Sequence, residues 1–367
     1  RCLIALSRGG ADADETREFD LAGKQWLKDG FYRPEAKGAL AWKDIDHVYA
    51  YTDFGAGSMT ASGYPRIAKL WRRGTPLDSA DSVYQGSDDD MYIAAYRDHS
   101  KGFERDLVSR TLAFYNDELY LIGTDGGLVK IDVPNSAQKS VHKRHLLLEL
   151  REPWTVAGTT YPAGALIAAD FDAFMAGARD FSVLFRPDAA TSLAGHCWTR
   201  NFLLLNVLDD VKNRIAVLDP ASGWRAEPLA GAPAFGTLSV SALDDEESDD
   251  YLLTVTDYLT PTALMRGCIG QPPEILKQLP DFFDASRHEI SQRFALSKDG
   301  TRVPYFMVSQ KGMLSDGKNP TLLYGYGGFE ISLTPAYSAT VGRAWLSQGG
   351  VFAVANIRGG GEYGPGW

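Results

Sequence analysis

The sequence lacks the features that mark several classes of protein. No stretch approaches the roughly 18 consecutive apolar residues that a membrane-spanning helix needs, so no membrane segment is predicted. The 367 residues include three cysteines, Cys2, Cys197 and Cys268, and no C-x-x-C pair. This count excludes a disulfide framework and argues against a zinc site. A low cysteine content is typical of reducing compartments, so we expect a cytoplasmic protein.

Positive charge is also in short supply. Lysine and arginine total 37 against 47 aspartate and glutamate residues, which gives a net charge of −10. Nucleic-acid binding requires a basic face, so this balance argues against a nucleic-acid partner. None of the six histidines lies in an H-E-x-x-H pattern, and the sequence has neither a Walker motif nor a G-x-G-x-x-G fingerprint. We therefore expect no metal and no cofactor.

Residues 1–283 have the pattern of an all-β domain. Short apolar runs recur between turn residues, among them Cys2–Ser7, Val48–Phe54, Phe202–Leu208 and Tyr251–Asp257. The first two runs start 46 residues apart, and the last two start 49 apart. Four-stranded propeller blades repeat at about 40–50 residues, so this region would hold five to six blades. A pair of β-sandwiches is the alternative.

The pattern changes after residue 283. Two short strands around the Asp299-Gly300 turn predict a hairpin, and a helix is expected near residues 338–347. Thr321–Tyr324 and Val351–Ile357 are apolar runs that each end in glycines, and the second is typical of a buried strand. Residues 284–367 therefore read as the opening of an α/β sheet, where ligands bind at the carboxyl ends of the strands.

Two glycine-rich segments resemble motifs of the prolyl oligopeptidase family of serine peptidases. They are NPTLLYGYGGF at residues 319–329 and VFAVANIRGGGEYGPGW at residues 351–367. The resemblance implies a seven-bladed β-propeller, incomplete here, followed by the first strands of an α/β-hydrolase domain. It also implies a serine-type oligopeptidase that hydrolyses short peptides through an acyl-enzyme, in the manner of a prolyl endopeptidase.

The resemblance assigns roles to two residues of the first motif. Tyr326 matches a family tyrosine whose hydroxyl donates to the oxyanion of the reacting carbonyl. Phe329 matches a wall of the pocket for the residue before the scissile bond, although a core phenylalanine is an equal alternative. Tyr324 is expected to be structural. In the second motif, Arg358 and Glu362 are expected to form a structural ion pair or to be surface charges.

No G-x-S-x-G nucleophile elbow occurs in these residues. The resemblance places the elbow after Trp367 and a joining segment before Arg1, so we expect a chain truncated at both ends and inactive alone. The alternatives are a catalytically inactive propeller scaffold or binding module, and an esterase or acylaminoacyl-type hydrolase of the same superfamily. The oligomeric state and the residue preferred before the scissile bond stay open.

Overall fold

A computed structural model describes all 367 residues, Arg1–Trp367. The chain forms two compact units. Unit 1 contains Arg1–Leu148 and Ala169–Arg179, and unit 2 contains Glu149–Ala168 and Asp180–Trp367. The boundary expected at residue 283 concerns the end of the propeller and stays a prediction.

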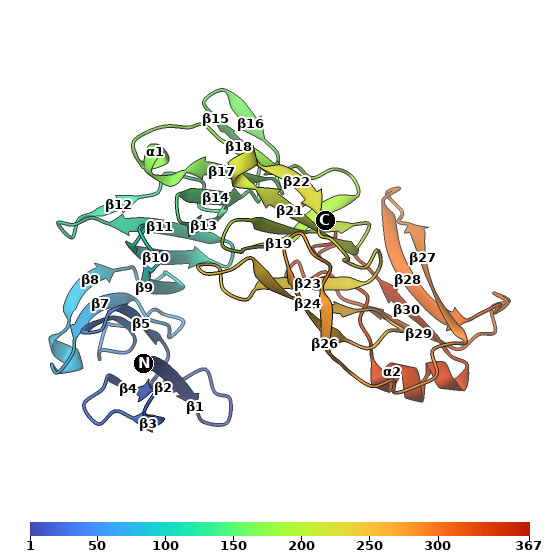
Figure 1. Ribbon diagram of the computed structural model, residues 1–367, viewed down its shortest axis with the longest axis horizontal. Coiled ribbons are helices and arrows are strands. Elements are labelled where there is room, and N and C mark those ends of the chain that lie inside the picture. Colours follow the sequence, from blue (N-terminus) through green and yellow to red (C-terminus); the bar gives the residue numbers. More distant parts are fainter. The chain divides into compact units, whose positions relative to one another are not determined.

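Unit 1 contains three antiparallel four-stranded sheets (Figure 1). The first sheet consists of β1 (Cys2–Ser7), β2 (Asp14–Asp20), β3 (Gln25–Trp26) and β4 (Tyr32–Ala36). The second consists of β5 (Ala39–Asp44), β6 (His47–Tyr51), β7 (Ile67–Arg72) and β8 (Asp81–Gln85), with the short helix η1 (Leu77–Ser79) before β8. The third consists of β9 (Tyr92–Asp98), β10 (Arg105–Ala113), β11 (Asn116–Ile122) and β12 (Leu128–Lys130).

Apolar side chains from the second and third sheets form one buried cluster. Tyr49 and Ala68 come from the second sheet, and Ile93, Ala95 and Val108 come from the third. Side chains alternate between the two faces of a strand, so each sheet can present one apolar face to its neighbour. This face-to-face packing is the arrangement that the blade-length repeat predicts.

The division between the two units falls within the next group of strands. This group is the fourth sheet and consists of β13 (Gln138–His142), β14 (His145–Glu149), β17 (Leu166–Asp170) and β18 (Ser182–Phe185). A separate hairpin of β15 (Trp154–Val156) and β16 (Thr159–Tyr161) lies between β14 and β17 in sequence. Asp170 caps the short helix α1 (Phe171–Met175), since its carboxylate accepts a hydrogen bond from the Ala173 N–H at 3.0 Å.

Unit 2 contains two further antiparallel four-stranded sheets. The fifth sheet consists of β19 (Thr191–Trp198), β20 (Leu203–Asp209), β21 (Lys212–Asp219) and β22 (Arg225–Pro228), with η2 (Pro220–Ser222) before β22. The sixth consists of β23 (Thr237–Ala242), β24 (Asp250–Thr256), β25 (Ala263–Cys268) and β26 (Glu274–Gln278). The apolar run Phe202–Leu208 corresponds to β20, which pairs with β21 as an antiparallel hairpin.

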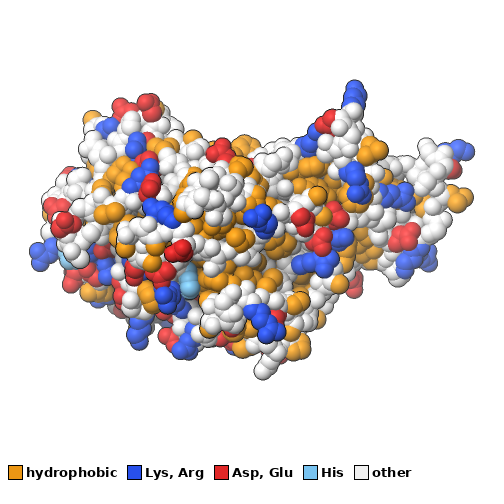
Figure 2. All heavy atoms as spheres, turned by 90° about the horizontal axis from the view of Figure 1, so that it is seen from above, with side chains coloured by type: hydrophobic (Ala, Val, Ile, Leu, Met, Phe, Trp, Pro, Cys, Tyr) orange, Lys and Arg blue, Asp and Glu red, His pale blue; other side chains and the backbone are white.

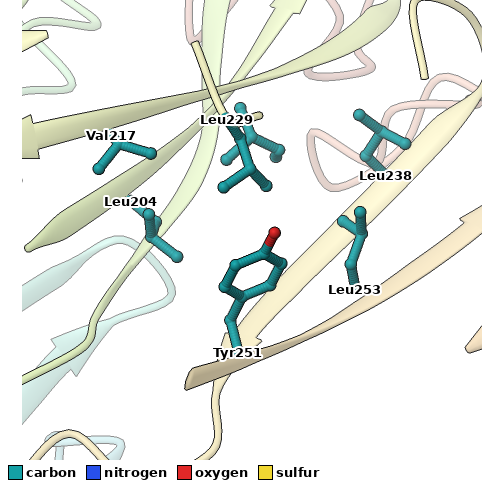
Figure 3. Packing of buried hydrophobic residues seen from close by; sticks show 7 residues of the cluster. Leu204, Val217, Leu229, Leu238, Tyr251 and Leu253 are labelled. Atoms are coloured by element: carbon teal, nitrogen blue, oxygen red, sulfur yellow. The ribbon is translucent and has the colours of Figure 1, made fainter. Parts of the chain in front are cut away.

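The core between the fifth and sixth sheets is built around Tyr251 (Figure 3). Leu204 and Val217 approach from the fifth sheet, and Leu238 and Leu253 approach from the sixth. Tyr251 is fully buried, and its ring lies against Gly267, where a β-carbon would overlap the ring. The absence of a side chain at Gly267 is therefore what admits the tyrosine.

The last part of unit 2 is a mixed sheet in the order β27-β28-β30-β29. It consists of β27 (His288–Leu296), β28 (Arg302–Gln310), β29 (Thr321–Gly325) and β30 (Val351–Ala355), with α2 (Ala339–Ala344) and η3 (Leu346–Gln348) between β29 and β30. The predicted hairpin around Asp299-Gly300 and the predicted helix near residues 338–347 are confirmed. Phe306, Val308 and Val354 of this sheet pack against Val211 and Tyr258, which lie in the connections after β20 and β24.

Charged side chains of both signs are interspersed with apolar ones over the face seen in Figure 2. None of the helices in the structure has the length and apolar character to cross a bilayer.

The substitution Gly267→Ala is expected to lower the free energy of unfolding by about 1–3 kcal/mol, because the new methyl group overpacks the core against Tyr251. Urea denaturation measures the effect. Gly366→Ala is the matched control, since a β-carbon there meets no atom within 4 Å. Equal stability of the two variants would mean that the Tyr251 ring moves aside without cost.

Candidate functional site

The two glycine-rich motifs lie at the same edge of the mixed sheet. β29 and β30 are parallel neighbours, and Gly325 at the end of β29 is opposite Ala355 at the end of β30. The loop after each strand therefore emerges at the shared carboxyl edge, the position at which open α/β sheets bind ligands. Residues 326–329 and 356–362 meet there, although about 30 residues separate them in sequence.

Backbone contact joins the two loops. A β-carbon on Gly359 would overlap the carbonyl oxygen of Gly327, and one on Gly327 would overlap the carbonyl oxygen of Arg358. Gly359 also has a φ of 94°, a conformation that favours glycine. Both positions thus require glycine, and the loops approach more closely than side chains would permit.

Tyr326 is the first residue after β29, and 37% of its surface is exposed. Its ring folds over Gly328, where a β-carbon would lie 2.7 Å from the tyrosine hydroxyl oxygen. No group of the protein accepts a hydrogen bond from this hydroxyl. The side chain therefore presents a free phenolic donor at the carboxyl edge of the sheet. Tyr324 is within β29 and is also exposed.

Phe329 is 66% exposed in this chain. Its φ is 54°, and the φ of Glu330 is also 54°. Two consecutive bulky residues in the left-handed region are unusual, because each costs on the order of 1–3 kcal/mol and persists only where the surroundings enforce it. The loop is therefore held in a strained conformation that displays the phenyl ring to solvent.

An ion pair holds the second of these strained residues. Arg151 donates to both carboxylate oxygens of Glu330, with Nη1 2.7 Å from Oε2 and Nη2 bonded to Oε1. Both side chains are about a quarter exposed. Glu149 lies nearby: burial raises its pKa, the Arg151 charge lowers it, and the Glu330 charge raises it, with a net upward shift. One guanidinium thus faces two carboxylates.

Glu362 organises the second loop from inside the protein. It is fully buried, and its Oε1 accepts from the Leu333 N–H at 2.9 Å and from the Asn356 side-chain amide at 3.0 Å. Of the two expectations for this motif, an ion pair between Glu362 and Arg358 is wrong, and a surface charge is confirmed for Arg358 but wrong for Glu362. Arg358 is exposed and pairs with Asp299 of the β27–β28 turn instead, while Glu362 satisfies amide donors in the interior.

A cavity of about 590 Å³ lies beside this site within unit 2. Its walls combine residues of the fifth and sixth sheets with residues of the segments that follow β14, β29 and β30, and they include Glu149, Ser192, Asn213, Glu330, Ser332 and Tyr363. Three hydrogen bonds tie these parts together. Ser192 donates to the Glu362 carbonyl at 2.9 Å, Thr237 to the Pro335 carbonyl at 2.6 Å, and the Tyr363 hydroxyl to Asp210 at 3.0 Å.

Consecutive four-stranded repeats followed by a glycine-rich sheet edge define a propeller-containing protein with a candidate site at that edge. The chain matches the family model described as prolyl oligopeptidase, N-terminal β-propeller domain, over residues 1–266. It therefore belongs to the prolyl oligopeptidase family, as its two motifs indicated.

Relatives in this family carry peptidase names. The chain is 39% identical over 378 aligned residues to the uncharacterized peptidase y4nA of Sinorhizobium fredii, covering 100% of this chain and 52% of that protein. It is 41% identical over 136 residues to a prolyl endopeptidase of Elizabethkingia miricola, covering 37% of this chain and 19% of that protein. The chain spans about half the length of the relatives that it matches from end to end.

The fold is also found in solved structures. A post-proline cleaving enzyme from Rickettsia typhi superposes with a TM-score of 0.91 at 28% identity, covering 100% of this chain and 55% of that chain. The all-β propeller architecture expected from the sequence is therefore confirmed.

The sequence alone missed the groups that support the site. Arg151 lies 179 residues before its partner Glu330, in a segment without any recognisable motif. Glu362 lies within a recognised motif, but its charge suggested solvent exposure. No local signal reveals the ion pair, whereas the run of glycines around Glu362 does indicate close backbone packing.

Replacing Glu362 separates its hydrogen bonding from its charge. We expect Glu362→Ala to lower the free energy of unfolding by about 1–3 kcal/mol, since it leaves the Leu333 N–H without its acceptor. Glu362→Gln keeps an acceptor oxygen and should cost less than half as much. Thermal and urea denaturation provide the comparison, and equal losses for the two variants would show that the negative charge itself is required.

Proposed function

We propose that the protein containing this chain is a serine-type oligopeptidase that cleaves short peptides after proline through an acyl-enzyme. The observation that carries the proposal is the free hydroxyl of Tyr326 at the carboxyl edge of β29. The names of relatives support it, because two of them are a prolyl endopeptidase and a post-proline cleaving enzyme.

In this proposal, Tyr326 acts on the oxyanion. Attack on a peptide carbonyl places negative charge on its oxygen, and a positioned hydroxyl stabilises that charge more strongly in the transition state than in the ground state. The contact between Gly327 and Gly359 holds the loop, so the donor needs little reorganisation during the reaction. The remainder of the whole protein would supply the nucleophile and its base.

Phe329 would form part of the pocket for the residue before the scissile bond. Its exposed ring offers a flat apolar surface on which a proline ring can pack. The strained backbone at Phe329 and Glu330 supports a functional reading, since such strain gathers at ligand-binding sites. The propeller would end at residue 283, and the peptidase domain would start at residue 284.

Tyr326→Phe in the whole protein should keep the fold and lower turnover of a prolyl peptide by about 10²–10³-fold, the usual loss for one oxyanion donor. Steady-state kinetics and circular dichroism measure the two effects. Tyr324→Phe is the matched control, because it removes a hydroxyl from an exposed tyrosine two residues away. Full turnover in Tyr326→Phe would rule out the oxyanion role.

Phe329→Ala in the whole protein should raise the KM for a substrate with proline before the scissile bond by about tenfold, the value of one lost aromatic contact. The KM for the matching alanine substrate should change less, because alanine offers little surface to the ring. An equal rise in KM for both substrates would exclude Phe329 from the pocket wall.

A further inference from the structure

We propose that Arg151 is a positioning residue for the proposed peptidase site and sets the preference for proline by fixing the Phe329–Glu330 loop through its bidentate ion pair with Glu330. This inference rests on the proposed function for its role in specificity. The positioning itself concerns contacts within this chain and can be tested without activity.

The loop needs an external restraint. Phe329 and Glu330 both have a φ of 54°, which side-chain-bearing residues avoid. Two backbone hydrogen bonds form at the turn: the Glu330 N–H donates to the Gly359 carbonyl of the second loop at 3.1 Å, and the Ile331 N–H donates to the Gly328 carbonyl at 3.1 Å. These bonds persist only while Glu330 keeps its left-handed conformation, and they leave the direction of its side chain undetermined.

Arg151 supplies that restraint, and its neighbouring backbone is itself held by hydrogen bonds. The preceding residue, Leu150, is 1% exposed and its N–H donates to the Ala165 carbonyl at 2.9 Å. The Leu150 carbonyl also accepts from the Gly164 N–H. The backbone next to Arg151 is therefore hydrogen-bonded to Gly164 and Ala165, the two residues before β17. These bonds fix the position from which the guanidinium reaches Glu330.

The chemistry of the pair favours arginine. A planar guanidinium that binds both oxygens of a carboxylate fixes its orientation as well as its distance, which a lysine ammonium cannot do. Because Glu330 follows Phe329 directly, orienting the carboxylate also orients the backbone that carries the phenyl ring. In this way Arg151 positions Phe329, the proposed wall of the substrate pocket.

A second carboxylate, that of Glu149, lies near the ion pair of Arg151 with Glu330. Glu149 and Glu330 both line the cavity, and the charge of Arg151 lowers the pKa of Glu149 while the charge of Glu330 raises it. Without the guanidinium, repulsion between the two carboxylates would move Glu330 away from its present position. Removing Arg151 should therefore displace the loop rather than simply loosen it.

Hydrogen exchange on the full chain tests the positioning. In Arg151→Met, the amides of Glu330 and Ile331 should exchange at least about tenfold faster than in the wild type, as expected after loss of a charge-assisted restraint. Arg151→Lys should fall between the two. Arg225→Met is the matched control, because it breaks an exposed ion pair with Glu227 in the same unit. Exchange in Arg151→Met equal to that of the control overturns the proposal.

Kinetics on the whole protein test the role in specificity. Arg151→Met should lower kcat/KM for the proline substrate about tenfold more than for the alanine substrate, mainly through KM, as Phe329→Ala does. A purely structural defect would lower kcat/KM by the same factor for both substrates, and that result overturns the specificity role. Should the wild type cleave neither peptide, the proposed function and this specificity role fail together, while hydrogen exchange still decides the positioning.

Discussion

The site depends on the contact between two peptide backbones at Gly327 and Gly359. Neither position has room for a β-carbon, so the loops after β29 and β30 can meet without side chains between them. Tyr326 precedes one end of this contact, and Phe329 follows it by two residues. A larger separation of the loops would move the phenolic hydroxyl relative to the phenyl ring, and the roles proposed for these two side chains require that both lie at one edge of the sheet.

The surrounding protein holds this contact from several directions. Glu362 binds the Leu333 and Asn356 amide groups from inside, and Arg151 binds Glu330 from the cavity side. Ser192 and Thr237 of the fifth and sixth sheets donate to carbonyls of the C-terminal segment. Side-chain to backbone bonds of this kind leave the identity of the bonded residue free while fixing its position. The propeller sheets thus serve as part of the scaffold of the site.

Much of the fold could be predicted from the sequence because local patterns carry it. The run Cys2–Ser7 coincides with β1, and the turn at Asp299-Gly300 closes a hairpin as its composition predicts. The placement of Tyr326 at a strand end also followed from its motif. Contacts between residues far apart in sequence could not be predicted from local patterns. The Arg151–Glu330 pair spans 179 residues, and the burial of Glu362 depends on donors from other segments. The exposure of β29 likewise follows from its place at the sheet edge, which its apolar composition does not show.

The bond from Ser192 to the Glu362 carbonyl has a consequence for the folding pathway. It joins residues 170 positions apart, and the bond from Thr237 to Pro335 joins residues 98 apart. Closing loops of this length costs chain entropy that a single hydrogen bond cannot recover. We therefore expect the fifth and sixth sheets, which pair neighbouring strands, to form before the C-terminal segment docks on them. A ribosome that releases the chain from its N-terminus presents the parts in this same order.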